Sequence, residues 1–397
     1  MEWKEVTLEE IGTIVGGATP STKRTSFYDG DIPWLTPKDL SANSNKYIFR
    51  GERNITAEGF NSCSCKMLPK GSVLFSSRAP IGYVAIAASE MCTNQGFKSV
   101  IPNEDTDSEF LYYLLKYNKD NIVSQGSGTT FAEVSGKTMK GIEVVVPKEV
   151  DDQRRIASIL SSLDRKIELN NKINADLEEM AQAIFKNWFV DFEPFKDGKF
   201  VDSELGMIPE GWKVGSPYEY AKVVYGAPYK SAKFNDNGEG FPLIRIRHLK
   251  DCNPQFYTSE ILPQTEYINM GDIVAGMDAE FVPHIWKGKT GLLNQRVCKL
   301  MPQQTSISNL FVLYLMKPEL EFVQSYKTGT TVSHLGKADI DKFVVVLPPL
   351  EVVEECSKIL DSILQRIKNI STESRILSTL RDTLLPRLMS GEIEVPE

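Results

Sequence analysis

Residues 126–138 read GSGTTFAEVSGKT, a segment that combines glycines and hydroxyls with a closing Gly-Lys-Thr. A phosphate-binding loop has the pattern G-x-x-x-x-G-K-[ST], because its glycines let backbone N–H groups converge with the lysine and the hydroxyl on phosphates and magnesium. Gly136, Lys137 and Thr138 match the second half of this pattern, but the first glycine is replaced by Phe131. The apolar run IEVVVP also follows the segment, whereas a strand should precede such a loop. We therefore expect no nucleotide site here.

Other patterns that would support catalysis are incomplete. NPQF at 253–256 is similar to the N-P-P-[YF] of methyltransferases that act on flipped bases, but no glycine-rich cofactor loop precedes it. MDAEF at 277–281 has two carboxylates without the closely following lysine that a metal nuclease needs. The three histidines are His248, His284 and His334. None of them forms a Ser-His-Asp or metal-binding pattern that would work in both halves of the chain. We expect a protein that is not an enzyme and that has no catalytic residues, metal or cofactor.

Composition limits the remaining classes of function. The chain has 397 residues, of which 41% are apolar and 25% charged, which is typical of a soluble globular protein with about two to four domains. No apolar run reaches the roughly 18 to 20 residues of a membrane span, and MEWKEVTLEEIG does not resemble a secretory signal, so we expect no membrane association and a cytoplasmic location. The six cysteines lack zinc-finger spacing and are expected to be structural thiols. The net charge of −8 disfavours nonspecific DNA binding, so a DNA role would need local patches or a basic partner.

The chain is an internal duplication of about 200 residues. VGGATP at 15–20 is echoed by VYGAPY at 224–229, and IPWL at 32–35 by FPLI at 241–244, both 209 residues later. PKGSVLFS at 69–76 pairs with NMGDIVAG at 269–276, 200 residues later. GTTFAEVSGKTMKGIEVVVP at 128–147 aligns with GTTVSHLGKADIDKFVVVLP, 201 residues later, which places Glu133 opposite His334. The Asn-Gln pairs at 94–95 and 294–295 recur in both copies, and we interpret them as structural amides that bind turn backbone, with DNA contact as the alternative.

Each copy consists of a domain rich in short β-type runs, followed by a long helix with a coiled-coil pattern. Apolar residues recur at alternating spacings of four and three over about four and a half heptads. The residues assigned to this seam are Ile156, Leu160, Leu163, Ile167, Asn174, Leu177, Ile184, Trp188, Leu360, Ile363, Ile367, Ser374, Leu377, Leu384 and Leu388. Asn174 and Ser374 place polarity near the middle of both helices, where it can specify register. The two helices are therefore predicted to form an antiparallel pair, although each one packing only on its own domain remains an alternative.

Two similar domains at a defined separation suit a split DNA site, because equivalent groove faces recur every ~10 to 10.5 bp. Domains that share a framework but differ in detail suit two different half-sites. A bivalent protein-interaction scaffold without DNA specificity would use the same geometry and is the alternative function.

Several segments in order carry a family resemblance: WKEVTLEEIGTIVGGATPS, IPWLTPKDL, TNQGFKSVIP, DDQRRIASILSSLDRKIELNN, AIFKNWFVDFEPF, ELGMIPEGWKV, GMDAEFVPHIWKGKTGLLNQRVCKL and LLPRLMSGEIEV. The chain resembles the DNA-specificity subunit of type I restriction-modification systems over nearly its whole length. The resemblance implies an α+β fold with two pseudo-symmetric, β-rich target-recognition domains joined by two long conserved helices that form an antiparallel coiled coil. It also implies a noncatalytic subunit whose partners are double-stranded DNA, two methyltransferase (modification) subunits and restriction subunits.

The implied layout is a first recognition domain at 1–149, a central helix at 150–193, a linker and second domain at 194–349, and a C-terminal helix and tail at 350–397. We expect the tail LLPRLMSGEIEV to pack near the first domain. Because Trp188 stands where the other helix has Leu388, the two methyltransferase subunits need not bind identically.

Base reading requires side chains with paired donors or acceptors on loops beside strands. In the first domain the candidate DNA contacts are Lys23, Arg24, Thr36, Lys38, Ser77, Arg78 and Thr129. In the second domain they are Lys230, Arg245, Arg247, His248, Asp278, His284, Lys287 and Thr330. Alternation in IRIRHL predicts a strand with both arginines on one face, and a solvated edge strand is the alternative.

Overall fold

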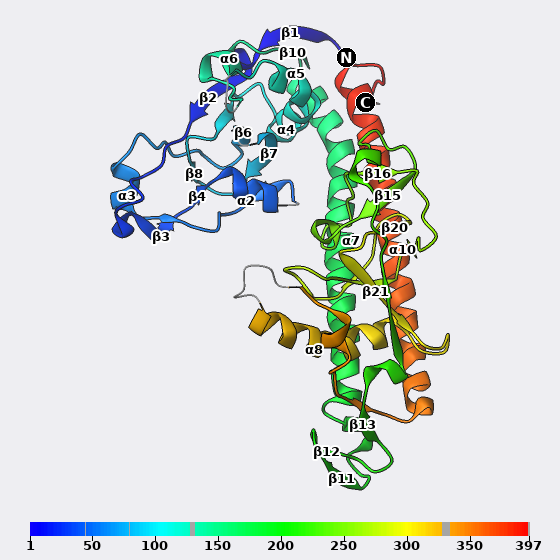
Figure 1. Cartoon of the computed structure of the whole chain (residues 1–397). Coiled ribbons are helices and arrows are strands. Elements are labelled where there is room, and N and C mark those ends of the chain that lie inside the picture. Colours follow the sequence, from blue (N-terminus) through cyan, green and yellow to red (C-terminus); the bar gives the residue numbers. More distant parts are fainter. Residues whose placement is uncertain (44, 79, 128–131, 328–333, 396–397) are drawn as a thin grey trace. The chain divides into compact units, whose positions relative to one another are not determined.

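The computed structural model describes residues 1–397 except 44, 79, 128–131, 328–333 and 396–397. The chain divides into two compact units, one formed by Met1–Leu169 with Ile376–Glu397 and the other by Asn170–Arg375. Each unit combines a β-rich domain with parts of two long helices, α7 (Val150–Phe189) and α10 (Leu350–Met389) (Figure 1). The prediction of an α+β fold with two β-rich regions and two long helices is confirmed.

The first unit is built around a sheet with the strand order β2-β9-β6-β7-β5, and β1 pairs separately with β10. The strands are β1 (Trp3–Thr7), β2 (Gly12–Gly16), β3 (Tyr28–Ile32), β4 (Trp34–Leu35), β5 (Tyr47–Ile48), β6 (Val73–Ser77), β7 (Ile81–Ala87), β8 (Cys92–Thr93), β9 (Lys98–Pro102) and β10 (Glu143–Pro147). The shorter helices are α1 (Leu8–Ile11), η1 (Thr25–Phe27), α2 (Pro37–Ala42), α3 (Ala57–Asn61), α4 (Ser108–Tyr117), α5 (Lys119–Ser124) and α6 (Gly136–Lys140). Asp107 caps the N-terminus of helix α4, because its carboxylate accepts from two backbone N–H groups of the first turn.

The second unit has a corresponding sheet with the order β14-β21-β18-β19. Its strands are β11 (Phe200–Ser203), β12 (Gly206–Pro209), β13 (Lys213–Gly215), β14 (Ala221–Tyr225), β15 (Phe241–Ile244), β16 (Tyr257–Thr258), β17 (Tyr267–Ile268), β18 (Ile273–Gly276), β19 (His284–Ile285), β20 (Gly291–Leu293), β21 (Val297–Pro302) and β22 (Val345–Leu347). Its shorter helices are η2 (Glu193–Phe195), η3 (Pro217–Glu219), η4 (Ser231–Lys233), η5 (Ile246–His248), α8 (Asn309–Lys327) and α9 (Lys337–Ile340). The hairpin of β11 and β12 lies in the linker between α7 and the second β-rich domain.

Strand pairing confirms the internal duplication residue by residue. Val15 pairs with Ser99 in the first unit, and Val224 pairs with Lys299 in the second, at the offsets read from the sequence. The parallel pair of β4 with β8 is likewise repeated by β15 with β20. Because a slip of one residue would turn every side chain to the other face, this shared register means that equivalent residues face equivalent ways.

The long helices pair with each other near their middles. In the second unit, the Nδ2 of Asn170 donates to the Ser374 hydroxyl at 3.2 Å and the Nδ2 of Asn174 donates to the Ser371 hydroxyl at 3.1 Å. A step of four residues forward along α7 thus corresponds to three residues backward along α10, so the helices are antiparallel. In the first unit, Arg381 binds Asp164 at 2.7 Å. Within each unit a part of α7 lies beside a part of α10 (Figure 1).

The predicted seam residues are all at least partly buried. Ile156, Leu160, Asn174, Leu360, Ile363, Ile367 and Leu388 are buried, and Leu163, Ile167, Leu177, Ile184, Trp188, Ser374, Leu377 and Leu384 are partly buried. Several of them belong to domain cores as well as to the helix pair: Ile156 and Leu160 join the core of the first unit, and Leu360 joins that of the second. The same seam residues therefore pair the two helices and pack against the β-rich domains.

The C-terminal tail packs in the first unit, as predicted. Leu388 and Met389 are buried in the same cluster as Phe110 of α4, and Ile393 packs against that cluster. The tail is thus part of the core that holds the first β-rich domain.

The segment that resembles a phosphate-binding loop has a different architecture. Its residues 128–131 lie outside the described part of the chain, and so do the predicted DNA contacts Thr129 and Thr330. Ser135 caps the five-residue helix α6 by accepting from the backbone N–H of Thr138. Strand β10 then follows, so the order is helix and then strand, which is the reverse of a phosphate-binding loop.

Candidate nucleic-acid interface

The second unit contains a cavity of about 630 Å³ whose wall carries side chains suited to base recognition. These side chains are Arg245, Arg247, Asp278, Asn294, Gln295 and Arg296. A guanidinium can donate to O6 and N7 of guanine, an amide can pair with adenine, and a carboxylate can accept from the amine of cytosine. The predicted contacts Arg245 and Arg247 are brought together here with Asp278, which lies far from them in sequence.

The segment that follows β15 differs from the prediction. An alternating strand over IRIRHL is wrong, because β15 ends at Ile244 and the next turn is the 3₁₀ helix η5. Arg245 lies with its guanidinium carbon 5.9 Å from the centre of the Phe256 ring, and Arg247 is exposed. His248 is only 2% exposed, and its Nδ1 accepts from the backbone N–H of Arg245 at 3.4 Å. Burial lowers the pKa of His248. This side chain caps the turn from inside the domain, which corrects its assignment as a DNA contact.

Asp278 is held in the cavity by two partners. Its carboxylate lies 3.1 Å from a guanidinium nitrogen of Arg296 and 2.7 Å from Nδ1 of His334. Backbone hydrogen bonds bring the three side chains together. The N–H of Met277 donates to the carbonyl of Arg296 at 2.9 Å, and the N–H of Leu335 donates to the carbonyl of Met277 at 2.8 Å.

The first unit has the same backbone arrangement with different side chains. The backbone N–H of Ser77 donates to the carbonyl of Gly96 at 2.7 Å, and the backbone N–H of Val134 donates to the carbonyl of Ser77 at 3.0 Å. Here Arg78 lies 3.7 Å from Glu133, and Lys98 lies 3.3 Å from the same carboxylate. Arg78 is partly exposed and is available for contact.

Ser77 itself is fully buried. Its side chain lies inside strand β6, every residue of which is buried, so its assignment as a DNA contact is also corrected. The prediction placed Ser77 on a loop beside a β-type run, but Ser77 is the last residue of strand β6.

The remaining candidates of the first domain occupy separate places. Lys23 and Arg24 are exposed in the segment before η1. Thr36 precedes α2, and both its backbone N–H and its hydroxyl donate to the Asp39 carboxylate at 2.7 Å. Lys38 is exposed and forms an ion pair with Glu52 at 2.7 Å.

In the second domain, two candidates face helix α7. Lys287 binds Glu178 of α7 at 2.6 Å, and both Lys287 and His284 line a cavity of about 350 Å³ beside that helix. Burial lowers the pKa of His284. These residues are thus separate from the arginine-lined cavity, and Lys287 anchors the domain on α7. Lys230 is exposed.

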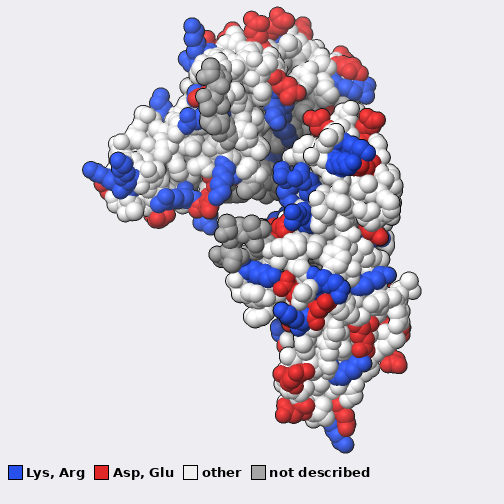
Figure 2. All heavy atoms as spheres, in the orientation of Figure 1, with Lys and Arg blue, Asp and Glu red and all other residues white. Residues whose placement is uncertain are grey.

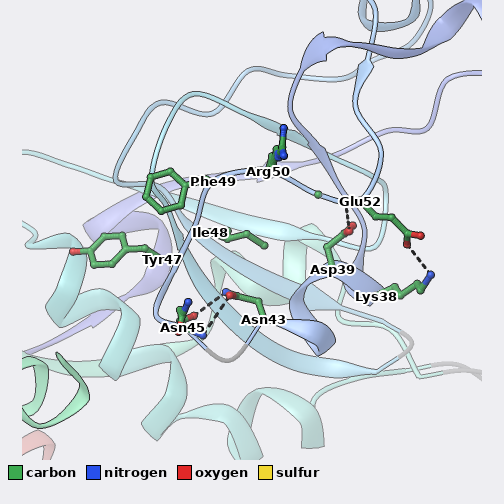
Figure 3. A pocket seen from close by; sticks show the side chains of 10 residues that line it. Lys38, Asp39, Asn43, Asn45, Tyr47, Ile48, Phe49, Arg50 and Glu52 are labelled. Atoms are coloured by element: carbon green, nitrogen blue, oxygen red, sulfur yellow. Dashed lines mark hydrogen bonds and ion pairs between the residues drawn. The ribbon is translucent and has the colours of Figure 1, made fainter. Parts of the chain in front are cut away.

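Sequence reasoning missed a further cavity of about 550 Å³ in the first domain (Figure 3). Lys38, Asn43, Asn45, Tyr47, Phe49 and Arg50 line it. Phe49 is 70% exposed, so its ring face is free to stack on a base. The signal was present in NKYIFRGER, where aromatic and basic residues are interleaved.

Arg296 was not among the predicted DNA contacts, although it directly follows the Asn-Gln pair at 294–295 that is interpreted as structural. That interpretation holds for the asparagines: Asn94 accepts from the N–H of Gly96 at 2.8 Å, and Asn294 accepts from the N–H of Arg296 at 3.2 Å.

Charge is distributed in small patches. Lysine and arginine side chains are interspersed with acidic ones over the face in Figure 2. In the part of the chain that the structure describes, no group of three or more His, Cys, Asp and Glu side chains is placed to hold a metal ion. None of the helices formed by the described residues is both long and apolar enough to cross a membrane.

Comparison with known proteins gives consistent matches. The family model described as type I restriction modification DNA specificity domain matches residues 1–179 and 209–378. The chain is 35% identical to the type I restriction enzyme MjaIX specificity subunit of Methanocaldococcus jannaschii, covering 100% of this chain and 94% of that protein. It is 23% identical to the HindI specificity subunit of Haemophilus influenzae over 83% of this chain and 88% of that protein. The crystal structure of a type I restriction-modification S subunit from M. genitalium aligns with a TM-score of 0.52 at 16% identity, covering 98% of this chain and 96% of that chain, and shows the same fold.

Proposed function

Because the chain belongs to the type I restriction-modification DNA specificity family, which is noncatalytic, we propose that it reads a split, asymmetric double-stranded DNA target. Each β-rich domain, taken as residues 1–149 and 194–349, contacts one half-site, and the pair of helices sets the gap between them. The main support is that strand pairing has the same register in both domains while the exposed side chains differ.

The overall charge of −8 argues that the chain binds DNA together with its partners. Affinity for the duplex depends on how many phosphates are neutralised by lysine and arginine, and here basic residues are interspersed with acidic ones. Methyltransferase subunits would supply the remaining phosphate contacts, and restriction subunits would join the same assembly.

Selection from a random DNA pool, with the modification subunits present, tests this function. We expect enrichment of two short motifs at a fixed gap. Replacing residues 3–149 by the corresponding segment of a relative should change only one of the two motifs. No enrichment at moderate salt, with the modification subunits still bound, would instead support a protein-interaction scaffold.

The gap can be tested by deleting matched heptads. Removing 166–172 from α7 together with 373–379 from α10 takes out Asn170 and its partner Ser374, and retains the pairs Asn174–Ser371 and Asp164–Arg381. Seven helical residues span about 10 Å, and a duplex rises about 3.4 Å per base pair. We expect a gap shorter by about 3 bp with both motifs unchanged.

The control for this experiment is deletion of 166–172 alone, which mismatches the helices and should prevent assembly. Altered motifs with an unaltered gap would contradict the role of the helices as a spacer.

Exposed apolar residues on the long helices are the proposed docking contacts for the modification subunits. Leu169, Ile376 and Leu380 in the first unit, and Met180 and Ile359 in the second, are exposed. Met180 and Leu380 occupy equivalent positions of the repeat. Exposed apolar side chains on a helix are typical of a protein interface when they are close together.

Native mass spectrometry of the assembly tests these contacts. Met180→Lys and Leu380→Lys should each remove one modification subunit, because each charge lies in one of two separate contacts. Ser158→Lys, at an exposed polar position of α7, is the control and should leave two. Retention of both subunits in all three variants would refute the assignment.

A further inference from the structure

The two domains share a three-point backbone frame beside their DNA-facing candidates. The first point is the residue after Ser77 in the first domain and the residue after Met277 in the second. The second point is the residue before Val134 and the residue before Leu335, respectively. The third point is Gly96 in the first domain and Arg296 in the second. In both domains the same two backbone hydrogen bonds join these segments, at 2.7 and 3.0 Å in the first domain and 2.9 and 2.8 Å in the second. Isolated β-bridges join Arg78 to Glu133 and Asp278 to His334 at the equivalent place. Side chains at these points can therefore be compared directly.

Each frame carries one guanidinium and one carboxylate, but in different places. In the first domain the guanidinium is at the first point, Arg78, and lies 3.7 Å from Glu133 at the second. In the second domain the carboxylate is at the first point, Asp278, and the guanidinium at the third, Arg296, 3.1 Å away.

Packing explains why the third point of the first domain carries no side chain. A Cβ added to Gly96 would lie 2.9 Å from Oδ1 of Asn94 and 2.9 Å from Cγ of Pro37. Such contacts are too short for a side chain, so an arginine can be placed there only in the second domain. The guanidinium group therefore lies on a different segment of the frame in each domain.

Stability does not account for these ion pairs. The side chains of Arg78 and Arg296 are 34% and 56% exposed, and ion pairs as exposed as these contribute little to folding. The backbone hydrogen bonds already hold the frame. A guanidinium has five N–H donors in a fixed fork, so contact with one carboxylate leaves donors for a second acceptor.

We propose that Arg78 and Arg296 each read a guanine, in different half-sites and at different places relative to the shared frame, and that Glu133 and Asp278 are positioning residues that aim them. This inference rests on the proposed DNA-reading function. Guanine matches the guanidinium because its O6 and N7 accept two parallel hydrogen bonds, which lysine cannot reproduce with the same geometry.

The test is selection from a random DNA pool with the assembled complex of the full chain and its modification subunits. Arg78→Ala and Arg296→Ala should each reduce the preference for guanine at one position of one half-site by about tenfold or more. The other half-site serves as an internal control for folding. Arg154→Ala, which removes an exposed arginine of α7 paired with a carboxylate, Asp151 at 2.9 Å, should leave every base preference unchanged.

The positioning role needs its own variants. Asp278→Ala should weaken the same guanine preference as Arg296→Ala, and Asp278→Glu, which restores a carboxylate, should recover most of it. A purely structural role for Asp278 predicts instead that preferences across the whole second half-site weaken together.

The outcomes separate this inference from the function on which it rests. Enrichment of a split motif by the unmodified chain, with Arg296→Ala and Arg78→Ala retaining all base preferences, would refute the guanine assignment and leave the function standing. An unmodified chain that enriches no motif would refute the function and the inference together.

Discussion

The two β-rich domains have the same strand register and both pack apolar side chains against α7, but the further contacts that hold them to α7 differ. The first domain places Lys46, which is 3% exposed, against Ser161 of α7 at 2.7 Å and Glu109 of α4 at 3.0 Å. The second domain uses aromatic packing, with Phe311 of α8 at 5.6 Å from Phe185 and 5.2 Å from Phe189 between ring centres. Its lysine contact, between Lys287 and Glu178, is partly exposed. A duplicated fold can therefore retain its backbone pairing while one copy adds a buried lysine contact to its apolar packing on α7 and the other adds a cluster of aromatic rings.

The largest difference in the loss of unfolding free energy is expected when the equivalent tryptophans, Trp3 and Trp212, are replaced. Trp212 is buried, with its ring centre 6.0 Å from that of Phe189 and 5.3 Å from that of Phe192. Trp212→Ala should lower the free energy of unfolding of the second unit by about 3 to 5 kcal/mol, because a large cavity remains. Trp3 is partly buried, and Trp3→Ala should cost about 1 to 2 kcal/mol. Urea unfolding monitored by hydrogen exchange in β21 and β9 measures the two effects, and equal losses would contradict the difference in anchoring.

The two lysine contacts should differ almost as strongly in their contribution to the free energy of unfolding. Lys46→Ala leaves Glu109 without its cation in a mostly buried site and should destabilise the first unit by about 3 kcal/mol. Lys287→Ala breaks a partly exposed pair and should cost less than about 1 kcal/mol. The comparison fails if the second substitution is as costly as the first in the same unfolding experiment.

The middle of the helix pair should respond in the opposite direction. The double variant Asn174→Leu with Ser371→Ala replaces a buried polar pair by apolar groups and is expected to stabilise the second unit by about 1 kcal/mol. Differential scanning calorimetry should show a rise in Tm of about 2 to 4 °C. Asn174→Leu alone leaves the Ser371 hydroxyl without this partner and should gain less. A lower Tm for the double variant would show that the polar pair stabilises the helices.

The smallest effect is a pH dependence confined to the first anchor. Burial opposes ionisation of Glu109, but hydrogen bonds from Ser161, Tyr47 and Lys46 outweigh it and hold the pKa of Glu109 below its ordinary value of 4.5. A lowered folded pKa contributes stability above pH 4.5 that is lost as the pH falls through the folded value. The loss of unfolding free energy caused by Glu109→Gln should thus be largest above about pH 5 and shrink below about pH 4.

Glu104→Gln, at an exposed turn, is the control and should show no such change between the two pH values. A constant difference between Glu109→Gln and the unmodified chain across this range would indicate that the carboxylate charge does not contribute to the anchor.

Much of the fold was predictable because it depends on local pattern. The repeat offsets predicted which strands correspond, and Val15–Ser99 and Val224–Lys299 pair accordingly. The heptad spacing predicted the helix pair, although the observed partner of Asn174 is Ser371 and that of Asn170 is Ser374.

The candidate site was predictable only in part. Arg245, Arg247 and Asp278 were found from residue type and do meet in one cavity. Ser77 and His248 were misassigned, because exposure depends on what packs over a residue and periodicity over a few positions does not report it. Arg296 and Phe49 were not predicted, because only the fold places Arg296 beside Asp278 and leaves the Phe49 ring exposed.

The sequence by itself determined the duplication, the class of fold and the helix seam, because repeats and hydrophobic periodicity are properties of the chain read in order. Only the tertiary structure decided where the guanidinium groups lie. Gly96 and Arg296 occupy the same point of the repeat, yet the neighbours of Gly96 exclude a side chain, while those of Arg296 leave it open in a cavity beside Asp278. That choice depends on atoms brought together from distant segments, which no local pattern contains.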